Sequence, residues 1–136
     1  MIVLDTHIWI WYISENFHRF PSAWLDQITG EDLVGVSGIC CYEIALAYSR
    51  NRLEIDMPLM NWFQDALDTS GISLLPITPE ISTQAVNLSP IHKDPFDRLI
   101  IATALVYDAK LASVDSCFKE YPELVNHLMS NEGGDR

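Results

Sequence analysis

Short apolar runs alternate along the chain with longer segments in which apolar residues recur at helical spacing. The short runs predict buried β-strands at residues 2–4, 33–37, 72–77 and 111–114. The longer segments predict helices at residues 6–13, 22–28, 39–50, 58–69, 78–87 and 94–108. Because strands that alternate with helices usually pair in parallel, the pattern favours an α/β fold with a central parallel sheet of four to five strands.

Residues suited to helix ends support several of these boundaries. Pro79 falls in the favoured first turn of one helix, and Asn51 suits the left-handed position that follows another. Residues 124–128 are interpreted as a final edge strand, and residues 131–136 have the composition of a frayed tail. We therefore predict a single domain over residues 1–130.

The composition fits a packed protein of one domain. The chain has 136 residues, of which 49% are hydrophobic and 20% charged, so it can bury a core and is unlike a disordered chain. No apolar stretch reaches the roughly 18 residues that span a membrane. The first apolar run lacks a preceding basic segment and carries Asp5 and His7, which is unlike a secretory signal. The sequence predicts a cytoplasmic protein.

The net charge of -11 limits the kinds of partner that the chain can bind tightly. It counts against strong non-specific binding of nucleic acid, which depends on basic residues. It is compatible with a small basic rim around a metal-charged pocket, and it favours a basic protein partner. The cysteines Cys40, Cys41 and Cys117 have no zinc-site spacing, so we predict that they are buried packing residues.

Four acids stand where apolar elements meet a boundary or interrupt an apolar face: Asp5, Glu43, Asp97 and Asp115. Asp5 and Asp115 each follow a predicted strand, and the carboxyl ends of parallel strands face one crevice. The alternative is that each of these two acids only caps the helix or turn that follows it. Glu43 lies among apolar residues of a predicted helix, which favours a side chain that points into a site.

The segment from Asp94 to Asp97 has two interpretations, because it is also a good helix start. We predict that Asp94 caps the helix, that Pro95 is its first residue, and that Asp97 projects from the first turn toward the crevice. Arg98 and Lys93 could approach a phosphate at the rim of the crevice, or they could be solvated surface residues.

Carboxylates that converge in this way need a cation. Like charges about 4 Å apart repel by roughly 4 kcal/mol at an effective dielectric constant near 20. Without a metal some of the acids should have raised pKa values, and with one or two hard cations the oxygen ligands suit Mg²⁺ or Mn²⁺. His7 and His92 have no helical partner for a zinc motif. Several aromatic residues could stack on bases, or could build the core or a subunit contact: Trp9, Trp11, Tyr12, Trp24, Trp62 and Tyr107.

Four segments together resemble the PIN-domain family, and more narrowly the VapC-type toxins of type II toxin-antitoxin pairs. They are residues 4–7, 37–45, 94–102 and 111–115, and the likeness extends from Met1 to about Pro122. The resemblance implies a three-layer sandwich around a parallel sheet, a ribonuclease with an acidic Mg²⁺ or Mn²⁺ site, and inhibition by a cognate antitoxin with a basic segment. It also suggests a homodimer.

The resemblance assigns the site residue by residue. Asp5 matches the first-strand acid, Glu43 the helix acid, Asp97 the acid before the Leu-Ile-Ile-Ala segment and Asp115 the acid after the later strand. The hydroxyl positions of such proteins correspond to Thr6 and Ser113. The chain departs from the subgroup where Trp, Lys and Gly are frequent and it has Tyr42, Ala47 and Asn51. None of these departures removes a ligand, but the missing lysine leaves the acids less compensated.

Two other functions remain open from the sequence. One is a catalytically silent PIN-like domain whose acidic pocket binds a basic protein segment. The other is a phosphotransferase or phosphatase with an aspartyl nucleophile at Asp5, although His7 stands where the common phosphatase motif has a second Asp.

Overall fold

A computed structural model describes residues 1–130, so the predicted tail at residues 131–136 lies outside the described part of the chain. Its centre is a parallel sheet in the order β3-β2-β1-β4. The strands are β1 (Ile2–Leu4), β2 (Val34–Ser37), β3 (Ser73–Leu75) and β4 (Lys110–Ala112). The predicted α/β fold with a central parallel sheet is confirmed, with four strands in the sheet.

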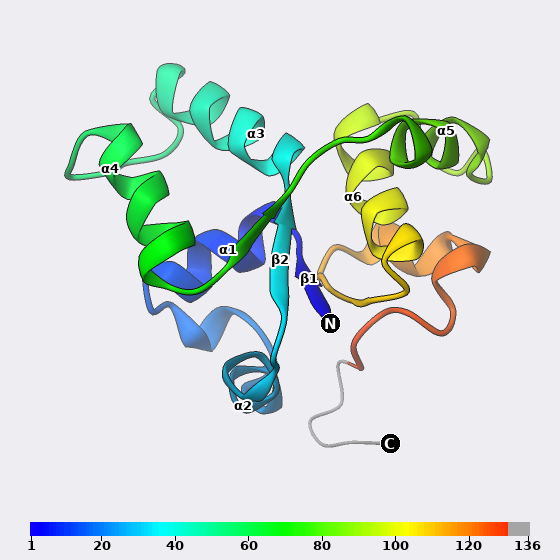
Figure 1. Cartoon of the computed structure of the whole chain (residues 1–136), viewed down its shortest axis with the longest axis horizontal. Coiled ribbons are helices and arrows are strands. Elements are labelled where there is room, and N and C mark those ends of the chain that lie inside the picture. The colour runs from blue at the N-terminus through cyan, green and yellow to red at the C-terminus, as the bar shows by residue number, and fades with distance from the viewer. Residues whose placement is uncertain (131–136) are drawn as a thin grey trace.

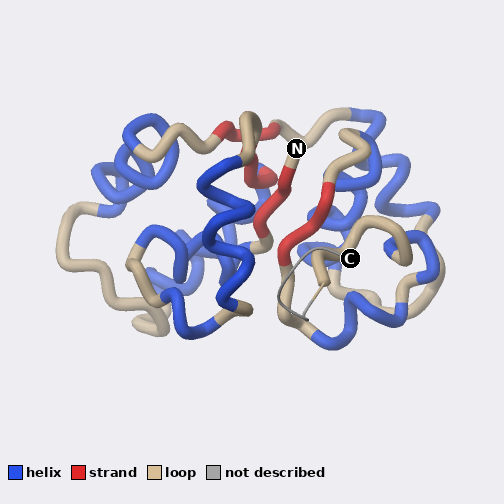
Figure 2. The backbone as a smooth tube through the Cα atoms, turned by 90° about the horizontal axis from the view of Figure 1, so that it is seen from below, coloured by secondary structure: helices blue, strands red, loops and turns tan. Residues whose placement is uncertain are grey.

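Helices cover both faces of the sheet. They are α1 (Thr6–Ile13), α2 (Ser22–Gly30), α3 (Gly38–Ser49), α4 (Leu59–Gln64), α5 (Pro79–Asn87) and α6 (Pro95–Val106). The π-helical turn η2 (Asp65–Thr69) continues α4, and three 3-10 turns are η1 (Phe17–Arg19), η3 (Ser116–Glu120) and η4 (Pro122–Leu124). Figure 1 shows α1, α3 and α4 on one side of the strands and α5 and α6 on the other. Figure 2 shows the same three layers from below, with strands between helices.

The predicted edge strand at residues 124–128 is wrong. The chain turns there, because the backbone N–H groups of His127 and Leu128 both donate to the carbonyl of Leu124, at 2.9 and 3.1 Å. Only an isolated parallel bridge joins Leu128 to Leu111 of β4. Leu124 is buried in the core, and burial of an apolar residue does not by itself distinguish a strand from a tight turn.

Three of the tryptophans build the core. Trp9 and Trp24 are fully buried, and the indole N–H of Trp9 donates to the carbonyl of Ala66 at 3.0 Å. Trp62 packs against Trp9, with ring centroids 5.4 Å apart. These rings are therefore inaccessible to a base. None of the helices within residues 1–130 has the length and apolar character that crossing a membrane requires.

The sheet register brings the ends of three strands together. Leu4, the last residue of β1, is paired with Val36 of β2 on one side and with Ala112 of β4 on the other. The backbone N–H of Asp5 extends the ladder by donating to the carbonyl of Ala112 at 3.1 Å. Since strand order reverses at β1, the crevice beyond its carboxyl end is where ligands collect in parallel sheets.

Candidate metal centre

Asp5 directly follows β1, the strand that lies between β2 and β4. Its side chain is 6% exposed, and its Oδ1 accepts a hydrogen bond from the backbone N–H of Ile8 at 2.9 Å, which caps α1. Burial raises the pKa of the Asp5 carboxyl, and the charge of Asp115 raises it further. Hydrogen bonds from Ser113 and Ile8 oppose this rise. Asp5 therefore acts as a helix cap, and its carboxylate is also held inside the crevice.

Glu43 reaches the same region from α3. The hydroxyl of Thr6 donates to its Oε1 at 2.6 Å, a contact between residues far apart in sequence. Burial raises the pKa of the Glu43 carboxyl, the charges of Asp94 and Asp5 add to the rise, and the Thr6 hydrogen bond opposes it. The Thr6 bond thus fixes the direction of a partly buried carboxylate.

Asp97 projects from the first turn of α6, and the pKa of its carboxyl is strongly raised. Burial raises this pKa to about 7, with further contributions from the charges of Asp94, Asp115, Glu43 and Asp5. Every other acid of the predicted site therefore lies close enough to act on Asp97. Repulsion of this kind favours a proton or a cation at the carboxyl.

Asp115 follows β4 and is exposed. Its Oδ1 accepts from the backbone N–H of Cys117 at 3.0 Å, and its own N–H donates to Ser113 Oγ at 3.1 Å. Ligand atoms of Asp97, Asp115 and Cys117 all lie within 4.8 Å of one another. The structure thus brings Asp97 and Asp115 into one compact group, with Asp5 and Glu43 close enough to shift the pKa of Asp97.

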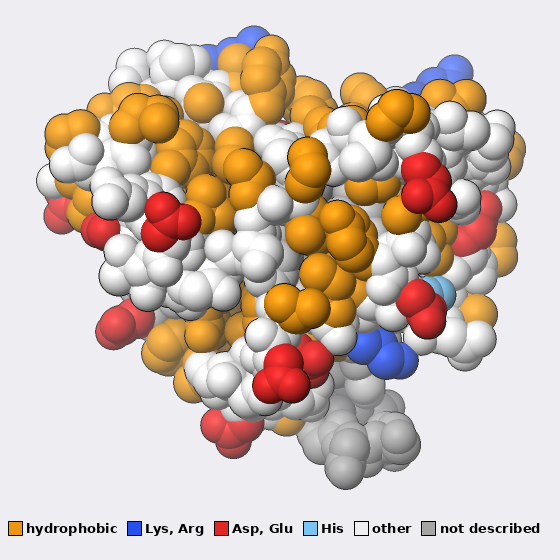
Figure 3. Space-filling model, in the orientation of Figure 1, with side chains coloured by type: hydrophobic (Ala, Val, Ile, Leu, Met, Phe, Trp, Pro, Cys, Tyr) orange, Lys and Arg blue, Asp and Glu red, His pale blue; other side chains and the backbone are white. Residues whose placement is uncertain are grey.

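No cationic side chain neutralises the four acids within residues 1–130. The ion pairs of this part of the chain join the N-terminus to Glu31, His92 to Glu120, and His127 to Asp108. His7 is the one nearby basic group that lowers the pKa values of Asp5 and Glu43. Figure 3 shows only small patches of lysine and arginine on the face drawn. A set of uncompensated, partly buried carboxylates fits a hard divalent cation with oxygen ligands.

Asp94 is the cap of α6, as the sequence predicts. Its Oδ1 accepts from the backbone N–H of Phe96 at 2.9 Å. The same carboxylate raises the pKa values of Glu43 and Asp97, so it also faces the acidic crevice. Only Oδ1 of Asp94 accepts the capping hydrogen bond, so Oδ2 does not take part in the cap.

Arg98 fits neither of the two alternatives that the sequence left open, a rim residue or a solvated surface residue. Its guanidinium donates to backbone carbonyls at the end of α5 and in the loop before α6, at 2.8 to 3.4 Å. The acceptors are the carbonyls of Ala85, Val86, Leu88, Ser89 and His92. Arg98 is therefore a structural residue that attaches the start of α6, and with it Asp97, to α5.

The prediction of buried packing residues is confirmed for Cys40, whereas Cys41 and Cys117 pack against the core but are only partly buried. The Sγ atom of Cys117 lies 4.0 Å from Asp97 Oδ2. Burial raises the pKa of this thiol to about 12, together with the charges and hydrogen bond of the neighbouring acids. Sequence reasoning missed this neighbour of the site. The sequence did offer one indication of this position. Cys117 follows Asp115 by two residues, and a turn capped by Asp115 places Cys117 close to the Asp115 carboxylate.

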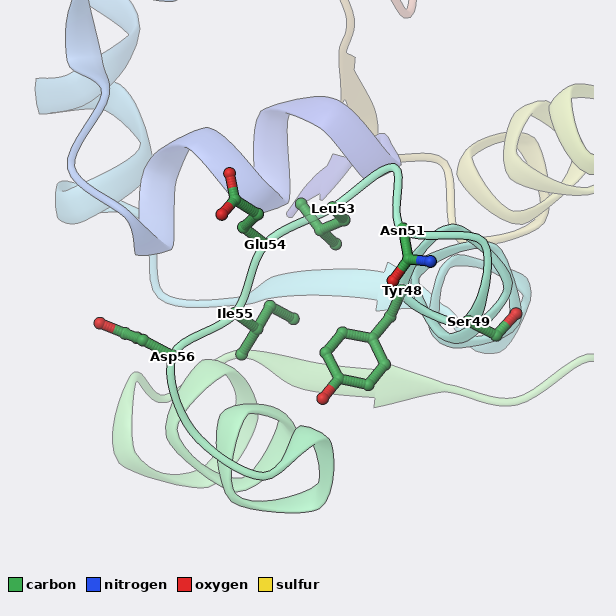
Figure 4. Close-up of a pocket in the computed structure, with 7 residues that line it drawn as sticks. All are labelled: Tyr48, Ser49, Asn51, Leu53, Glu54, Ile55 and Asp56. Carbon is green, nitrogen blue, oxygen red and sulfur yellow. The ribbon is translucent and has the colours of Figure 1, made fainter.

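A large hollow of the described surface does not include these acids. It has a volume of about 1010 Å³ and is formed by the end of α3 and the segment that follows it. Figure 4 shows Tyr48, Asn51 and Ile55 among its lining residues. None of the four acids lines it. Size alone therefore does not locate the chemistry, which we assign from the clustered carboxylates.

Comparison with known proteins gives consistent results. The family model of the PIN domain matches residues 2–124. Ribonuclease VapC22 of Mycobacterium tuberculosis (strain ATCC 25618 / H37Rv) is 30% identical over 115 residues, which are 84% of this chain and 86% of that protein.

Solved structures share the fold at lower sequence identity. VapBC2 from Rickettsia felis, bound to a DNA fragment from the promoter, aligns with a TM-score of 0.65 and 20% identity, over 95% of this chain and 98% of that chain. FitAcB from Neisseria gonorrhoeae aligns with a TM-score of 0.61 and 23% identity, over 96% of this chain and 98% of that chain.

Proposed function

The chain belongs to the PIN domain family and is of the VapC type, and on this basis we propose that it is a metal-dependent endoribonuclease toxin neutralised by a cognate antitoxin. The observation that carries the proposal is the convergence of Asp5, Glu43, Asp97 and Asp115 without a cationic partner among residues 1–130. Hydrolysis of an RNA phosphodiester is the chemistry that such a site serves best, because charge develops on phosphate oxygens during the reaction.

Asp5 and Asp97 are proposed as the principal ligands of Mg²⁺ or Mn²⁺, with Glu43 and Asp115 completing the site or holding a second ion. When bound, the ion lowers the pKa of water and stabilises negative charge on the phosphate. The protein contributes orientation. The Ile8 N–H and the Ser113 hydroxyl fix Asp5, and the Thr6 hydroxyl fixes Glu43.

Asp97 links cation binding to a proton. Its raised pKa of about 7 means that its carboxyl is largely protonated below neutral pH when no cation is present. A cation ligand must be deprotonated, so binding at Asp97 releases that proton and becomes tighter as pH rises. Cleavage should therefore increase with pH through the neutral range.

A basic antitoxin segment is the proposed protein partner. The net charge of -11 and the uncompensated acids attract such a segment, and the fold is shared with a toxin-antitoxin complex from Klebsiella pneumoniae, at a TM-score of 0.61. We also propose a homodimer that acts in the cytoplasm.

Cleavage by the purified protein tests the proposal. Labelled RNA should be cut in the presence of Mn²⁺ or Mg²⁺ and remain intact in EDTA. Asp5→Asn should abolish cleavage while the fold is kept, because asparagine also accepts the capping hydrogen bond from Ile8. An Asp5→Asn variant that cuts as well as the parent contradicts the assignment. A parent protein that cuts no RNA with either cation favours a silent acidic pocket that only binds protein.

A further inference from the structure

A second, smaller hollow opens directly beside the acidic crevice. Its volume is about 130 Å³, and Glu43 forms part of its wall. The other lining residues are Leu46, Ala47, Arg50, Arg52 and Phe96. The hollow thus brings two arginines next to a proposed metal ligand, in a chain that has 8 lysines and arginines in total.

The end of α3 fixes how these arginines are presented. Arg50 is the C-cap of the helix, Asn51 follows with a left-handed φ of 56°, and the N–H of Arg52 donates back to the carbonyl of Ala47 at 2.9 Å. Asparagine tolerates this conformation better than most residues do. The tight turn therefore folds Arg52 back beside the last turn of the helix, so both arginines border the same hollow.

Both guanidinium groups are uncommitted. Arg50 and Arg52 are exposed, and within residues 1–130 neither side chain forms a hydrogen bond or an ion pair. Three other basic residues of the described chain have partners. Arg98 bonds to backbone carbonyls, Arg19 lies over the ring of Trp11, and Lys110 donates to the carbonyl of Asn126. Arg50 and Arg52 are thus free to bind an anion.

Phe96 lines the hollow, and Tyr42 packs against Phe96. Tyr42 directly precedes Glu43, and Phe96 directly precedes Asp97. Their ring centroids are 5.7 Å apart in a T-shaped arrangement, and Tyr42 is 56% exposed. An exposed ring held by a second ring offers a face on which a base can stack.

We propose that this hollow binds the phosphate next to the one that is cleaved, on a single-stranded RNA. Arg50 and Arg52 hold the phosphate, and Tyr42, supported by Phe96, stacks on the neighbouring base. The inference rests on the proposed ribonuclease function. It adds a binding track for the RNA strand beside the acids, formed by Arg50, Arg52 and Tyr42. Guanidinium forks suit phosphate oxygens, and stacking on an exposed ring needs a base that is not held in a duplex.

Binding of a short fluorescein-labelled single-stranded RNA, measured in EDTA by fluorescence anisotropy, tests the track without requiring cleavage. The variant Arg50→Ala/Arg52→Ala should bind about 10-fold more weakly at low salt. The slope of log Kd against log salt should fall by about 0.7, since one phosphate contact on a single strand contributes about 0.7. The matched control Arg19→Ala/Lys110→Ala removes the same charge from outside this hollow and should keep the parent slope.

Two substitutions of Tyr42 test the proposed stacking on a base. Tyr42→Ala should weaken binding of single-stranded RNA about 5-fold or more, whereas Tyr42→Phe should retain it, and neither should change binding of an RNA duplex. In cleavage assays with Mn²⁺, the double arginine variant should raise KM and leave kcat within about twofold.

Three results overturn the inference, and the first two concern RNA. One is an arginine variant whose affinity and salt slope equal those of the parent or of the charge-matched control, and the other is a parent that does not bind RNA in EDTA. An arginine variant that binds RNA normally but loses binding of an acidic peptide also overturns it, in favour of a protein partner. Failure of the proposed function is distinguishable, because the parent would then bind RNA in EDTA but not cut it with Mn²⁺.

Discussion

Asp97 is the residue at which the electrostatics of the site are most concentrated. Its carboxyl is partly buried and lies near four other acids, and its pKa is raised to about 7. The unfolded chain has the ordinary value of 3.8, so the folded protein binds a proton more tightly at this position. In the absence of a cation, Asp97 therefore makes the folded state less stable as pH rises from about 4 to about 7.

Substitution of Asp97 should expose this effect. In EDTA, the parent should lose stability between pH 5 and pH 8 as Asp97 loses its proton, whereas Asp97→Asn has no carboxyl at this position to deprotonate. The free energy of unfolding of the variant minus that of the parent should therefore increase over this pH range. Urea unfolding at the two pH values measures it. Adding Mg²⁺ at pH 8 should stabilise the parent more than the variant. A difference between the proteins that does not change with pH would show that the Asp97 pKa is not raised.

Thr6 should act through Glu43. Thr6→Val keeps the shape of the side chain and removes the 2.6 Å hydrogen bond to Glu43 Oε1, so the carboxylate loses its fixed direction. Loss of a partner that orients a ligand typically costs about 10- to 100-fold in metal affinity or activity. The Mn²⁺ concentration for half-maximal cleavage should rise by this factor in Thr6→Val and stay near the parent value in Thr6→Ser. If Thr6→Val and Thr6→Ser need the same Mn²⁺ concentration for half-maximal cleavage, the Thr6 hydroxyl does not orient Glu43 for metal binding.

At this scale the sequence locates the acids but not all of their neighbours. Asp5 and Asp115 are predictable because carboxylates after parallel strands face a common edge. Arg98 and Cys117 are not, because the direction of each side chain depends on the packing of distant segments. The Arg98 guanidinium donates to backbone carbonyls at the end of α5, and the turn capped by Asp115 places the Cys117 side chain near Asp97.

Among the elements, α6 matters most for the site, since its cap and first turn carry two acids. Asp94→Ser keeps an N-cap acceptor for the N–H of Phe96 but removes the charge near Asp97. If Asp94 is only a cap, cleavage should stay within about threefold of the parent. The variant Asp94→Ala lacks the cap and should lose about 1 kcal/mol in urea unfolding. Loss of cleavage in Asp94→Ser as severe as in Asp97→Asn would make Asp94 a ligand.

Arg98 should be required for the attachment of α6 to α5. Arg98→Ala leaves several backbone carbonyls without their charged donor, and hydrogen bonds to charged groups contribute about 1.5–3 kcal/mol each when lost singly. We expect Arg98→Ala to lower the free energy of unfolding by about 2–4 kcal/mol in urea, and Arg52→Ala, which removes an exposed guanidinium, to change it by less than about 0.5 kcal/mol. Equal stability of the two variants would contradict the structural role of Arg98.

The helix boundaries were predictable wherever capping chemistry marks them. Thr78 accepts from the N–H of Ile81 and Asp94 from that of Phe96, so both helices begin where the sequence places their caps. The predicted start of α1 at Thr6 is also confirmed, and Asp5 provides its cap. The strand predicted at residues 124–128 was wrong because a short segment without regular alternation of apolar and polar residues does not distinguish a strand from a turn.

At the scale of the whole molecule, the fold turns distant parts of the sequence into one site. β1 lies between β2 and β4, so the segments after these strands converge beyond one edge of the sheet. The alternation of strands and helices predicts this convergence. It does not predict the strand order, or the hollow between Glu43 and the two arginines, because these depend on how helices pack across the sheet.

The most direct test of the shared centre is to locate the ion itself. Crystals of the protein soaked in Mn²⁺ should show an anomalous scattering peak among the carboxylates of Asp5, Glu43, Asp97 and Asp115, and crystals of Asp97→Asn soaked in the same way should show a weaker peak or none. A peak on another surface, or the absence of any peak at a Mn²⁺ concentration that supports cleavage, would contradict the account.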